Sequence, residues 1–594
     1  MKRVWQKLTC LMISFMVLGC AGTQDSSGST NSGNNPKWAS TWSYDEENHW
    51  HASTDKNSDE ASDLAPHDFG EWEDVNPSSL KGVEQYAFSN PKIKKCKTCG
   101  YYLLDGMNTL PEFRFTTTVP SEVSFVTTAK KDDIDRPEIS GTVTLTNCDN
   151  IYQKNEVAAT IKVRGNQTAN WAKKAFRVKF NNKTNLLGLN NGQKYKKWVL
   201  LADAKDTTLI RSAAGFYIAE AICKDEEQIW VSDFTPVSVY LNDQYWGYYY
   251  LAEQKEVKDG RVHLEEPAEG YQGTDIGYCF ELDYYATDEP KKSDGGDPTF
   301  KVTYSPDFTR SDYNTESGAV ADYGAIKTYT LLSDITDSTA GANKPINEKN
   351  SEQVAFIKKR VESLYTVLYN AAKNKVAKTI VNNEVVDTSD SIEKVIRDNF
   401  DVDTWVDGFI FNAFQCAPDL GYSSFYMSFD NTSKGDKKLR YDVPWDFDSN
   451  FGNRSGFITT ADTASASSGM WGGGGGTYDP YYMDRTSNMW INLFSRLDFF
   501  MDLVKAKWNK LREERVFESL FLMMRTYFRG YDSEMVRNFY RWPKNDATYE
   551  LRSPFKDPKQ YKEAQQETIN WCSKRVNYLE KKWGTNRSNI DTGE

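Results

Sequence analysis

The stretch around which this 594-residue chain is organised is 441–452, Tyr-Asp-Val-Pro-Trp-Asp-Phe-Asp-Ser-Asn-Phe-Gly. It places two carboxylates, Asp446 and Asp448, two positions apart, between a predicted strand and a glycine-containing turn. Hard divalent cations such as Mg²⁺ bind one or two protein carboxylates and leave other positions to water and phosphate oxygens. An exposed turn after an edge strand is the alternative, because Asp, Ser, Asn and Gly are ordinary turn residues. The interleaved aromatic residues favour a packed segment.

Length and composition narrow the class of protein. A chain of 594 residues predicts about three or four domains. The net charge of −12, from 72 basic and 84 acidic residues, argues against nucleic acid as a partner. Aromatic residues make up 14% of the chain, which is typical of extracellular β-rich or carbohydrate-facing proteins.

The first residues predict export. Residues 1–19 combine a basic start with a short apolar run, as a signal peptide does, and the ending Val-Leu-Gly-Cys resembles a bacterial lipobox. Cys20 would then be the acylated first residue, and 20–37 would be a flexible tether rich in Ser, Gly and Asn. We therefore expect an exported protein held at the outer face of the bacterial cytoplasmic membrane by its lipid alone. Secretion after cleavage elsewhere is the alternative.

A small unit at 38–105 is rich in metal-binding residue types. It holds three of the four histidines, His49, His51 and His67, and ends with Cys96 and Cys99 in a Cys-x-x-Cys-Gly turn. Imidazole and thiolate groups at such spacings can form a tetrahedral structural zinc site. A Cys96–Cys99 disulfide and free thiols are the alternatives.

Alternating strands follow from residue 110, with Thr and Val enriched at every second position. After a glycine turn at 163–168, the stretch 173–180 alternates basic and apolar residues. It predicts a strand with Lys173 or Lys174, Arg177 and Lys179 on one face, as a polyphosphate site needs. A charged, solvated sheet edge is the alternative. The first predicted strands are 112–118, 121–128, 139–145 and 158–163.

The remaining elements are mixed. A hairpin is predicted at 236–251, and a strand at 277–283 carries Glu281. The stretch 286–350 is rich in Asp, Ser, Thr, Gly and Pro and predicts an insertion of loops, and a glycine-rich loop is expected at about 455–480. Helices are predicted at 207–221, 352–377, 401–414, 488–529 and 558–583.

Several blocks, taken in chain order, resemble the signature blocks of the spore-coat CotH kinase family. The resemblance runs from about residue 109 to 460 and on toward 584. The blocks are Arg164-Gly165-Asn166, Lys173-Lys174 with Arg177, 198–201 with Asp206 and Arg211, 239–253, Asp403, and 444–448 with Phe451-Gly452.

The resemblance implies a fold and an activity. It implies an α+β, atypical protein-kinase-like domain at 106–584, with a β-rich N-terminal lobe and a mainly helical C-terminal lobe. Such a domain would bind ATP with Mg²⁺ or Mn²⁺ and phosphorylate Ser or Thr of extracellular or cell-surface proteins.

Phosphoryl transfer requires cations on the phosphates, a bridging metal and a carboxylate that orients the attacking hydroxyl. In this interpretation Asp446 binds the metal with help from Asp448, and Asp419 orients the hydroxyl. Ser424 stands five residues after Asp419, where a kinase catalytic loop has a metal-binding Asn. The residues assigned to the nucleotide are Arg164, Lys173, Lys174, Arg177 and Arg211, with Glu253 or Glu281 as the partner of the lysine.

Two other classes of function stay open. One is a catalytically inactive surface scaffold or adhesion module that binds proteins or glycans. The other is a glycosidase with paired carboxylates. The spacing of Asp446 and Asp448 disfavours it, because residues two apart on a strand share a face and cannot easily span the roughly 5 Å or more that a sugar requires.

Overall fold

The computed structural model describes most of the chain between residues 37 and 590. The proposed signal, Cys20, nearly all of the tether, the strand predicted at 121–128 and the loop at 455–480 lie outside the described residues. The described residues are 37–44, 48–54, 60–75, 92–105, 110–117, 129–130, 136–165, 167–242, 244–265, 267–268, 271–283, 299–303, 326–332, 352–417, 419–420, 423–453, 488–542, 561–588 and 590.

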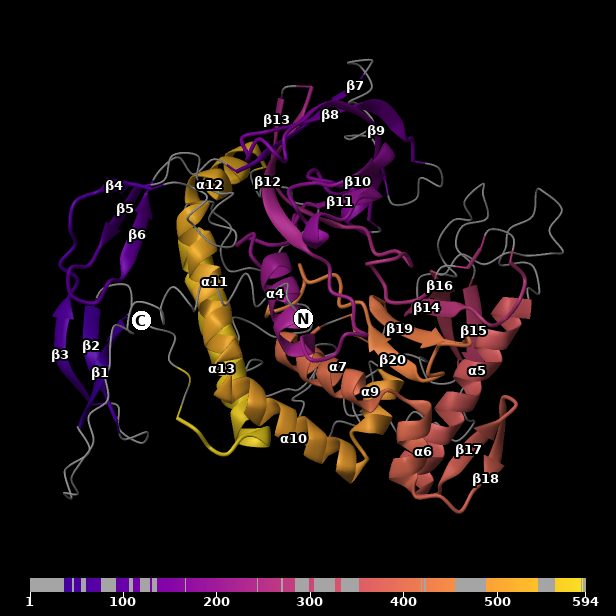
Figure 1. The fold of residues 1–594 in the computed structure, drawn as a ribbon. Helices are drawn as coiled ribbons and strands as arrows, with labels where there is room; N and C mark the ends of the chain where they lie inside the picture. The colour runs from indigo at the N-terminus through magenta and orange to yellow at the C-terminus, as the bar shows by residue number, and fades with distance from the viewer. Residues whose placement is uncertain are drawn as a thin grey trace, which may run out of the picture.

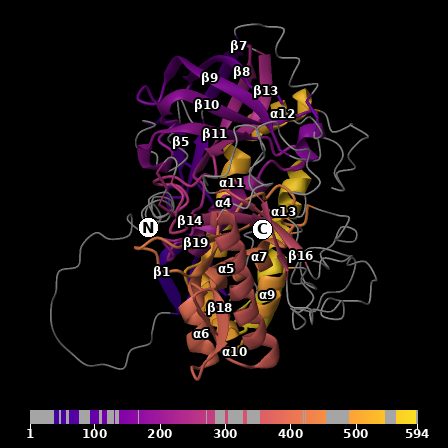
Figure 2. The ribbon, with the colours of Figure 1, turned by 90° about the vertical axis from the view of Figure 1, so that its right-hand side faces the viewer.

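Helices account for about 34% and strands for about 32% of the structure, which confirms the predicted α+β class. A β-barrel lies at the top of Figure 1, a five-stranded sheet at the right, helices below and between them, and two small sheets at the left. Figure 2 shows the same molecule turned by 90°, again with the barrel above the helices.

The barrel is closed, and its strands follow the order β10-β11-β13-β12-β7-β8-β9. Apolar residues alternate along the strands because successive side chains point to opposite faces, so one set fills the barrel. The hairpin predicted at 236–251 is confirmed as β12 and β13. The strands are β7 (Glu112–Thr117), β8 (Ile139–Thr146), β9 (Lys154–Arg164), β10 (Ala175–Thr184), β11 (Tyr195–Leu201), β12 (Phe234–Leu241) and β13 (Gln244–Glu253).

The second sheet has five strands in the order β15-β16-β14-β19-β20. Two of them lie inside the stretch 286–350, so the prediction of loops with little core is wrong there. Phe300, Val302, Tyr329 and Leu331 are buried, because apolar residues at alternate positions face the core even in a polar stretch. The strands are β14 (Gly277–Leu282), β15 (Thr299–Thr303), β16 (Ile326–Leu331), β19 (Phe425–Asp430) and β20 (Leu439–Asp442).

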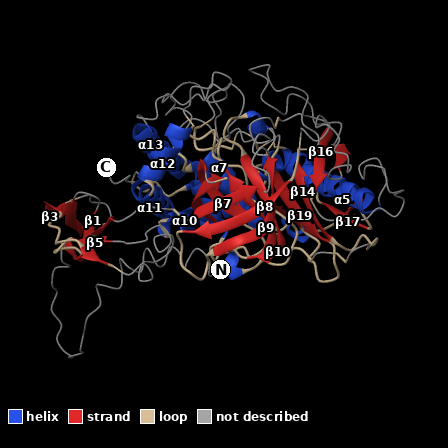
Figure 3. Ribbon diagram, turned by 90° about the horizontal axis from the view of Figure 1, so that it is seen from above, coloured by secondary structure: helices blue, strands red, loops and turns tan. Residues whose placement is uncertain are grey.

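Helices fill the space around this sheet and below the barrel (Figures 1 and 3). The helix predicted at 207–221 begins only at Arg211, where Asp206 accepts hydrogen bonds from the backbone amides of Ile210 and Arg211. Among the described residues, no helix is both long and apolar enough to cross a bilayer. The main helices are α4 (Arg211–Cys223), α5 (Glu352–Tyr369), α6 (Ile392–Asn399), α7 (Val402–Gln415), α9 (Met489–Phe494), α10 (Asp498–Glu513), α11 (Val516–Gly530), α12 (Asp532–Arg541) and α13 (Tyr561–Trp583).

Smaller sheets complete the described part of the chain. The N-terminal unit has two three-stranded sheets, β1-β2-β3 and β4-β5-β6, and a hairpin of β17 and β18 lies beside α6. Their strands are β1 (Trp38–Tyr44), β2 (Asn48–Ser53), β3 (Ala61–Pro66), β4 (Glu73–Asp74), β5 (Lys92–Lys95), β6 (Tyr102–Asp105), β17 (Lys378–Val381) and β18 (Glu384–Asp387).

Candidate functional site

The loop 443–453 follows β20 and lies in the core between the barrel and the helices. Phe447 and Phe451 are almost fully buried, whereas Asp446, which directly precedes Phe447, is exposed. Val443, Asp446 and Phe451 all have positive φ, of 49°, 66° and 51°. Left-handed backbone is costly for a β-branched residue such as Val443, and such strain is found where the surrounding structure holds a functional loop in place.

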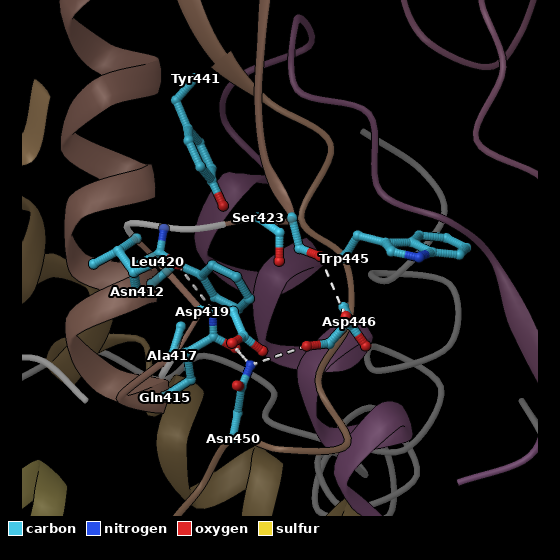
Figure 4. A pocket seen from close by; sticks show the side chains of 12 residues that line it. Asn412, Gln415, Ala417, Asp419, Leu420, Ser423, Tyr441, Trp445, Asp446 and Asn450 are labelled. Carbon is cyan, nitrogen blue, oxygen red and sulfur yellow. Dashed lines mark hydrogen bonds between the residues drawn. The ribbon is translucent and has the colours of Figure 1, made fainter. Parts of the chain in front are cut away.

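A cavity of about 20 Å³ opens beside this loop (Figure 4). Its lining comes from α7, the segment after α7, β20 and the loop, so distant parts of the sequence meet there. The lining residues are Phe411, Asn412, Gln415, Ala417, Asp419, Leu420, Ser423, Ser424, Tyr441, Trp445, Asp446 and Asn450. The structure thus brings together the two predicted catalytic carboxylates, Asp419 and Asp446.

A polar chain links Asp446 to the five-stranded sheet. The Ser424 hydroxyl donates to Asp446 Oδ2 at 3.2 Å, and the Ser424 amide donates to Glu281 Oε1 at 2.8 Å. Lys255 Nζ lies 3.5 Å from Glu281 Oε2. Burial raises the pKa of Glu281 to about 7, although Lys255 opposes the rise. Ser424 itself has a φ of 56°, so both partners of the hydroxyl bond have left-handed backbone.

Two cations flank this acidic group. Arg164, at the end of β9, lies with its guanidinium carbon 5.6 Å from the centre of the Trp445 ring. Burial lowers the pKa of Arg164 below its ordinary value, although the Asp446 carboxylate opposes this shift. Lys255 Nζ lies 4.0 Å from the Tyr426 ring and 5.7 Å from the Trp445 ring. The barrel strands and the residues that follow them therefore supply the positive charge of the site. Its carboxylates, Glu281 and Asp446, come from β14 and from the loop after β20.

Asn450 also lines the cavity, and side chains of α7 hold it in place. Its amide nitrogen donates to Gln415 Oε1 at 2.6 Å, and Gln415 in turn donates to Asn412 Oδ1 at 3.1 Å. The dashed lines in Figure 4 show this arrangement beside Asp419 and Asp446. An amide side chain from α7 thus fixes one wall of the cavity.

Asp448 faces a different group of side chains. It is buried, and Lys205 Nζ lies 3.7 Å from its Oδ1 while the Ser449 hydroxyl donates to the same oxygen at 3.3 Å. Burial raises its pKa to about 6, with Lys205 opposing the rise. Burial also raises the pKa of nearby Asp203 to about 7. The two carboxylates of the Asp-Phe-Asp sequence are therefore unequal in exposure and in partners.

Lys173 and Lys174 precede β10, so they do not share a strand face with Arg177 as predicted. Both are buried. Lys173 Nζ donates to the carbonyls of Ala202 and Tyr248 at 2.6 and 2.5 Å, and Lys174 Nζ to those of Ala169 and Trp171 at 2.6 and 2.8 Å. Buried ammonium groups need such acceptors, and here the backbone provides them.

The other residues assigned to the nucleotide have their own partners. The Arg211 guanidinium pairs with Asp206 and donates to Thr568 at 3.0 Å. Glu253 is fully buried and accepts from Asn190 at 2.6 Å and from the Asp233 amide at 3.0 Å. Half-exposed Arg177 lies 3.5 Å from Glu138.

Four of the five predicted zinc ligands converge in the N-terminal unit: His49, His67, Cys96 and Cys99. His51 does not join them, because its Nδ1 lies 3.2 Å from the Thr41 carbonyl and its ring is tilted against Trp42.

Sequence reasoning missed Lys255 and Asn450. Lys255 lies two residues after β13, and Asn450 lies four residues after Asp446. The signal for Lys255 was a lysine just beyond a predicted hairpin. Its proximity to Glu281 depends on how the barrel and the five-stranded sheet lie against each other, which residue spacing does not reveal.

The fold and the site define an α+β protein with an acidic cavity flanked by cationic side chains. A family model described as CotH kinase protein matches residues 161–579. The chain therefore belongs to the CotH kinase family, which confirms the resemblance found in its sequence. No curated protein matches the chain.

Proposed function

We propose that the chain is a CotH-type protein kinase that binds ATP with Mg²⁺ or Mn²⁺ and phosphorylates Ser or Thr of extracellular or cell-surface proteins. In this proposal the barrel is the N-terminal lobe, the sheet and helices form the C-terminal lobe, and ATP binds where they meet. The supporting observation is the cavity lined by Asp446 and Asp419, with Arg164 and Lys255 both close to the ring of Trp445, another of its lining residues.

The residues present fit a divalent cation. Asp446 is an exposed carboxylate on a loop whose neighbouring side chains are buried, and a hard cation in a nucleotide site needs only one or two such ligands beside water and phosphate oxygens. A kinase catalytic loop has a metal-binding Asn where this chain has Ser424. Asn450 lines the same cavity, and in this proposal its amide takes the place of that Asn. We propose Asp446 as the metal ligand, with Asn450 nearby as the second oxygen donor.

Lys255 and Arg164 are the cations that we assign to the phosphates. Lys255 pairs with Glu281, as a phosphate-binding lysine pairs with a glutamate in ordinary kinases. Lys173 and Lys174 are less suited, since backbone carbonyls already accept from their ammonium groups. Asp419 is the carboxylate that we assign to the attacking hydroxyl.

The cellular setting is also proposed. The lipobox-like ending at Cys20 and the tether support a lipid anchor at the outer face of the bacterial cytoplasmic membrane. A kinase placed there would act on extracellular or surface proteins.

Two observations favour the inactive scaffold as a second candidate. A cavity of about 20 Å³ holds little more than one water molecule, and Ser424 already donates to Asp446. ATP would have to lie largely outside this cavity, toward Arg164 and Lys255. A glycosidase has no comparable support, because Asp448 is buried against Lys205.

The test uses the full chain with radiolabelled ATP and either metal. We expect transfer of label to the chain itself or to a Ser-rich protein, and a raised Tm with ATP plus metal. Binding of nucleotide without transfer, or stabilisation by glycans and not by nucleotide, would support the scaffold instead.

A further inference from the structure

The N-terminal unit, which lies outside the matched residues 161–579, contains a second group of convergent side chains. One nitrogen each of His49 and His67 and the sulfurs of Cys96 and Cys99 all lie within 4.8 Å of one another. They come from three segments: β2, the residues after β3, and the turn between β5 and β6. The group therefore joins the two small sheets seen at the left of Figure 1.

The distances match those between ligands of a tetrahedral zinc ion. Cys96 Sγ lies 3.8 Å from His49 Nδ1, and Cys99 Sγ lies 3.4 Å from His67 Nδ1. With Zn–S of about 2.3 Å and Zn–N of about 2.0–2.1 Å, tetrahedral geometry requires about 3.6 Å between sulfur and nitrogen. Each cysteine thus faces a different histidine at the separation that one shared ion needs.

The backbone of the Cys-x-x-Cys turn suits two thiolates. The Gly100 amide donates to the Cys96 carbonyl at 3.1 Å, and the Tyr101 amide donates to Cys99 Sγ at 3.4 Å. Gly100 has a φ of +77°, a conformation that glycine adopts without cost. An amide aimed at sulfur stabilises its negative charge, which a metal-bound thiolate carries and a disulfide does not.

The described part of the unit has a small apolar core. Between residues 37 and 105, the apolar side chains described as buried are Ile93, Cys96 and Tyr101. Units of this size with so small a core are usually stabilised by a metal or by disulfides.

We propose that His49, His67, Cys96 and Cys99 bind one structural zinc ion that joins the β1–β3 sheet to the β4–β6 sheet. Four protein ligands fill a tetrahedral shell and leave no position for a substrate, so the site is structural. Two thiolates and two imidazoles favour zinc over Mg²⁺ or Ca²⁺, which prefer oxygen ligands.

The same site positions the unit on the rest of the molecule. Tyr101 stacks on His67, with ring centres 4.5 Å apart, and its hydroxyl accepts from Arg529 Nη1 at 2.7 Å. Arg529 lies at the end of α11. An ion that fixes His67 and Cys99 therefore also fixes the residue that contacts the kinase-family domain.

The first test measures zinc in the full chain purified without chelators. We expect about one zinc per chain, falling below about a tenth in Cys99→Ser and in His67→Ala. His51→Ala and Cys148→Ser are the matched controls, and both should keep the full amount. Zinc near zero in the wild type, or unchanged in the ligand variants, would overturn the proposal.

A second measurement does not depend on variants that fold. The wild-type chain, stripped of metal and loaded with Co²⁺, should show the visible absorption of tetrahedral cobalt and thiolate-to-cobalt charge transfer. Absence of these bands would refute the site. So would a Cys96–Cys99 disulfide in the native chain, detected by mass spectrometry after alkylation.

Discussion

At the scale of single residues, the structure separates side chains that look equivalent in the sequence. Asp446 and Asp448 stand two positions apart, yet one is exposed at the cavity and the other is buried against Lys205. The cause is the left-handed backbone at Asp446, which turns consecutive side chains away from the alternation of a strand. The sequence predicted the carboxylates at this loop, but their different exposure depends on dihedral angles that no spacing encodes.

The lysines provide a direct comparison. We expect Lys255→Met to weaken ATP binding by roughly tenfold or more while leaving the Tm nearly unchanged, because it removes a charge from the site. Lys173→Met should instead lower the free energy of unfolding by about 1–3 kcal/mol, because two buried carbonyls lose their donor. Calorimetric titration with ATP and thermal unfolding measure the two effects. A loss of ATP affinity confined to Lys173→Met would contradict the assignment.

Glu281 predicts a dependence of stability on pH. Burial raises its folded-state pKa from 4.5 to about 7. Between these values the unfolded chain has lost a proton that the folded chain keeps, so the wild type loses stability as pH rises. Glu281→Gln has no titrating carboxyl group at this position, so it does not share this loss of stability. The Tm of the variant relative to the wild type should therefore increase from about pH 5 to about pH 7 and then level off. A difference that does not vary with pH would show that Glu281 titrates normally.

At the scale of elements, close approach of helices positions the site loop. A side chain at Gly215 in α4 would overlap the Phe447 ring, and one at Gly408 in α7 would overlap Tyr441. These glycines have ordinary helical surroundings in sequence, so their role follows only from packing. Helix positions could be predicted from apolar periodicity, as for α7, whereas β15 and β16 were missed because polar residues hide their short apolar alternation.

This packing predicts the effect of a small substitution. Gly215→Ala should reduce the free energy of unfolding by about 1–3 kcal/mol, because the added methyl displaces Phe447 and with it Asp446. In a Phe447→Ala background the same change should cost much less, since the ring is gone. Thermal unfolding of the two single variants and the double variant measures this coupling. Simple additivity would mean that Gly215 and Phe447 do not interact.

At the scale of the whole molecule, the barrel and the five-stranded sheet each bring part of the site. Arg164 ends β9 and Lys255 lies two residues after β13, whereas Glu281 comes from β14 and Asp446 from the loop after β20. The order of these blocks along the chain could be predicted from the family resemblance. Their meeting could not, because it depends on a closed barrel whose β7 and β12 pair in parallel across more than a hundred residues.

The N-terminal unit adds a prediction at this scale. Tyr101→Phe removes the acceptor of Arg529 but leaves the four proposed zinc ligands intact. We expect full zinc content with faster tryptic release of the unit from the rest of the chain. Unchanged proteolysis would show that this hydrogen bond does not hold the unit in place.

The proposed function requires that Asp446 support phosphoryl transfer from ATP held beside this cavity, toward Arg164 and Lys255. The most direct measurement is transfer of phosphate from radiolabelled ATP by the wild type, Asp446→Asn and Asp502→Asn, an exposed aspartate on α10 that serves as the control. We expect Asp446→Asn to reduce transfer roughly 100-fold or more and Asp502→Asn to leave it unchanged. Equal transfer by Asp446→Asn and the wild type would contradict the assignment of this site.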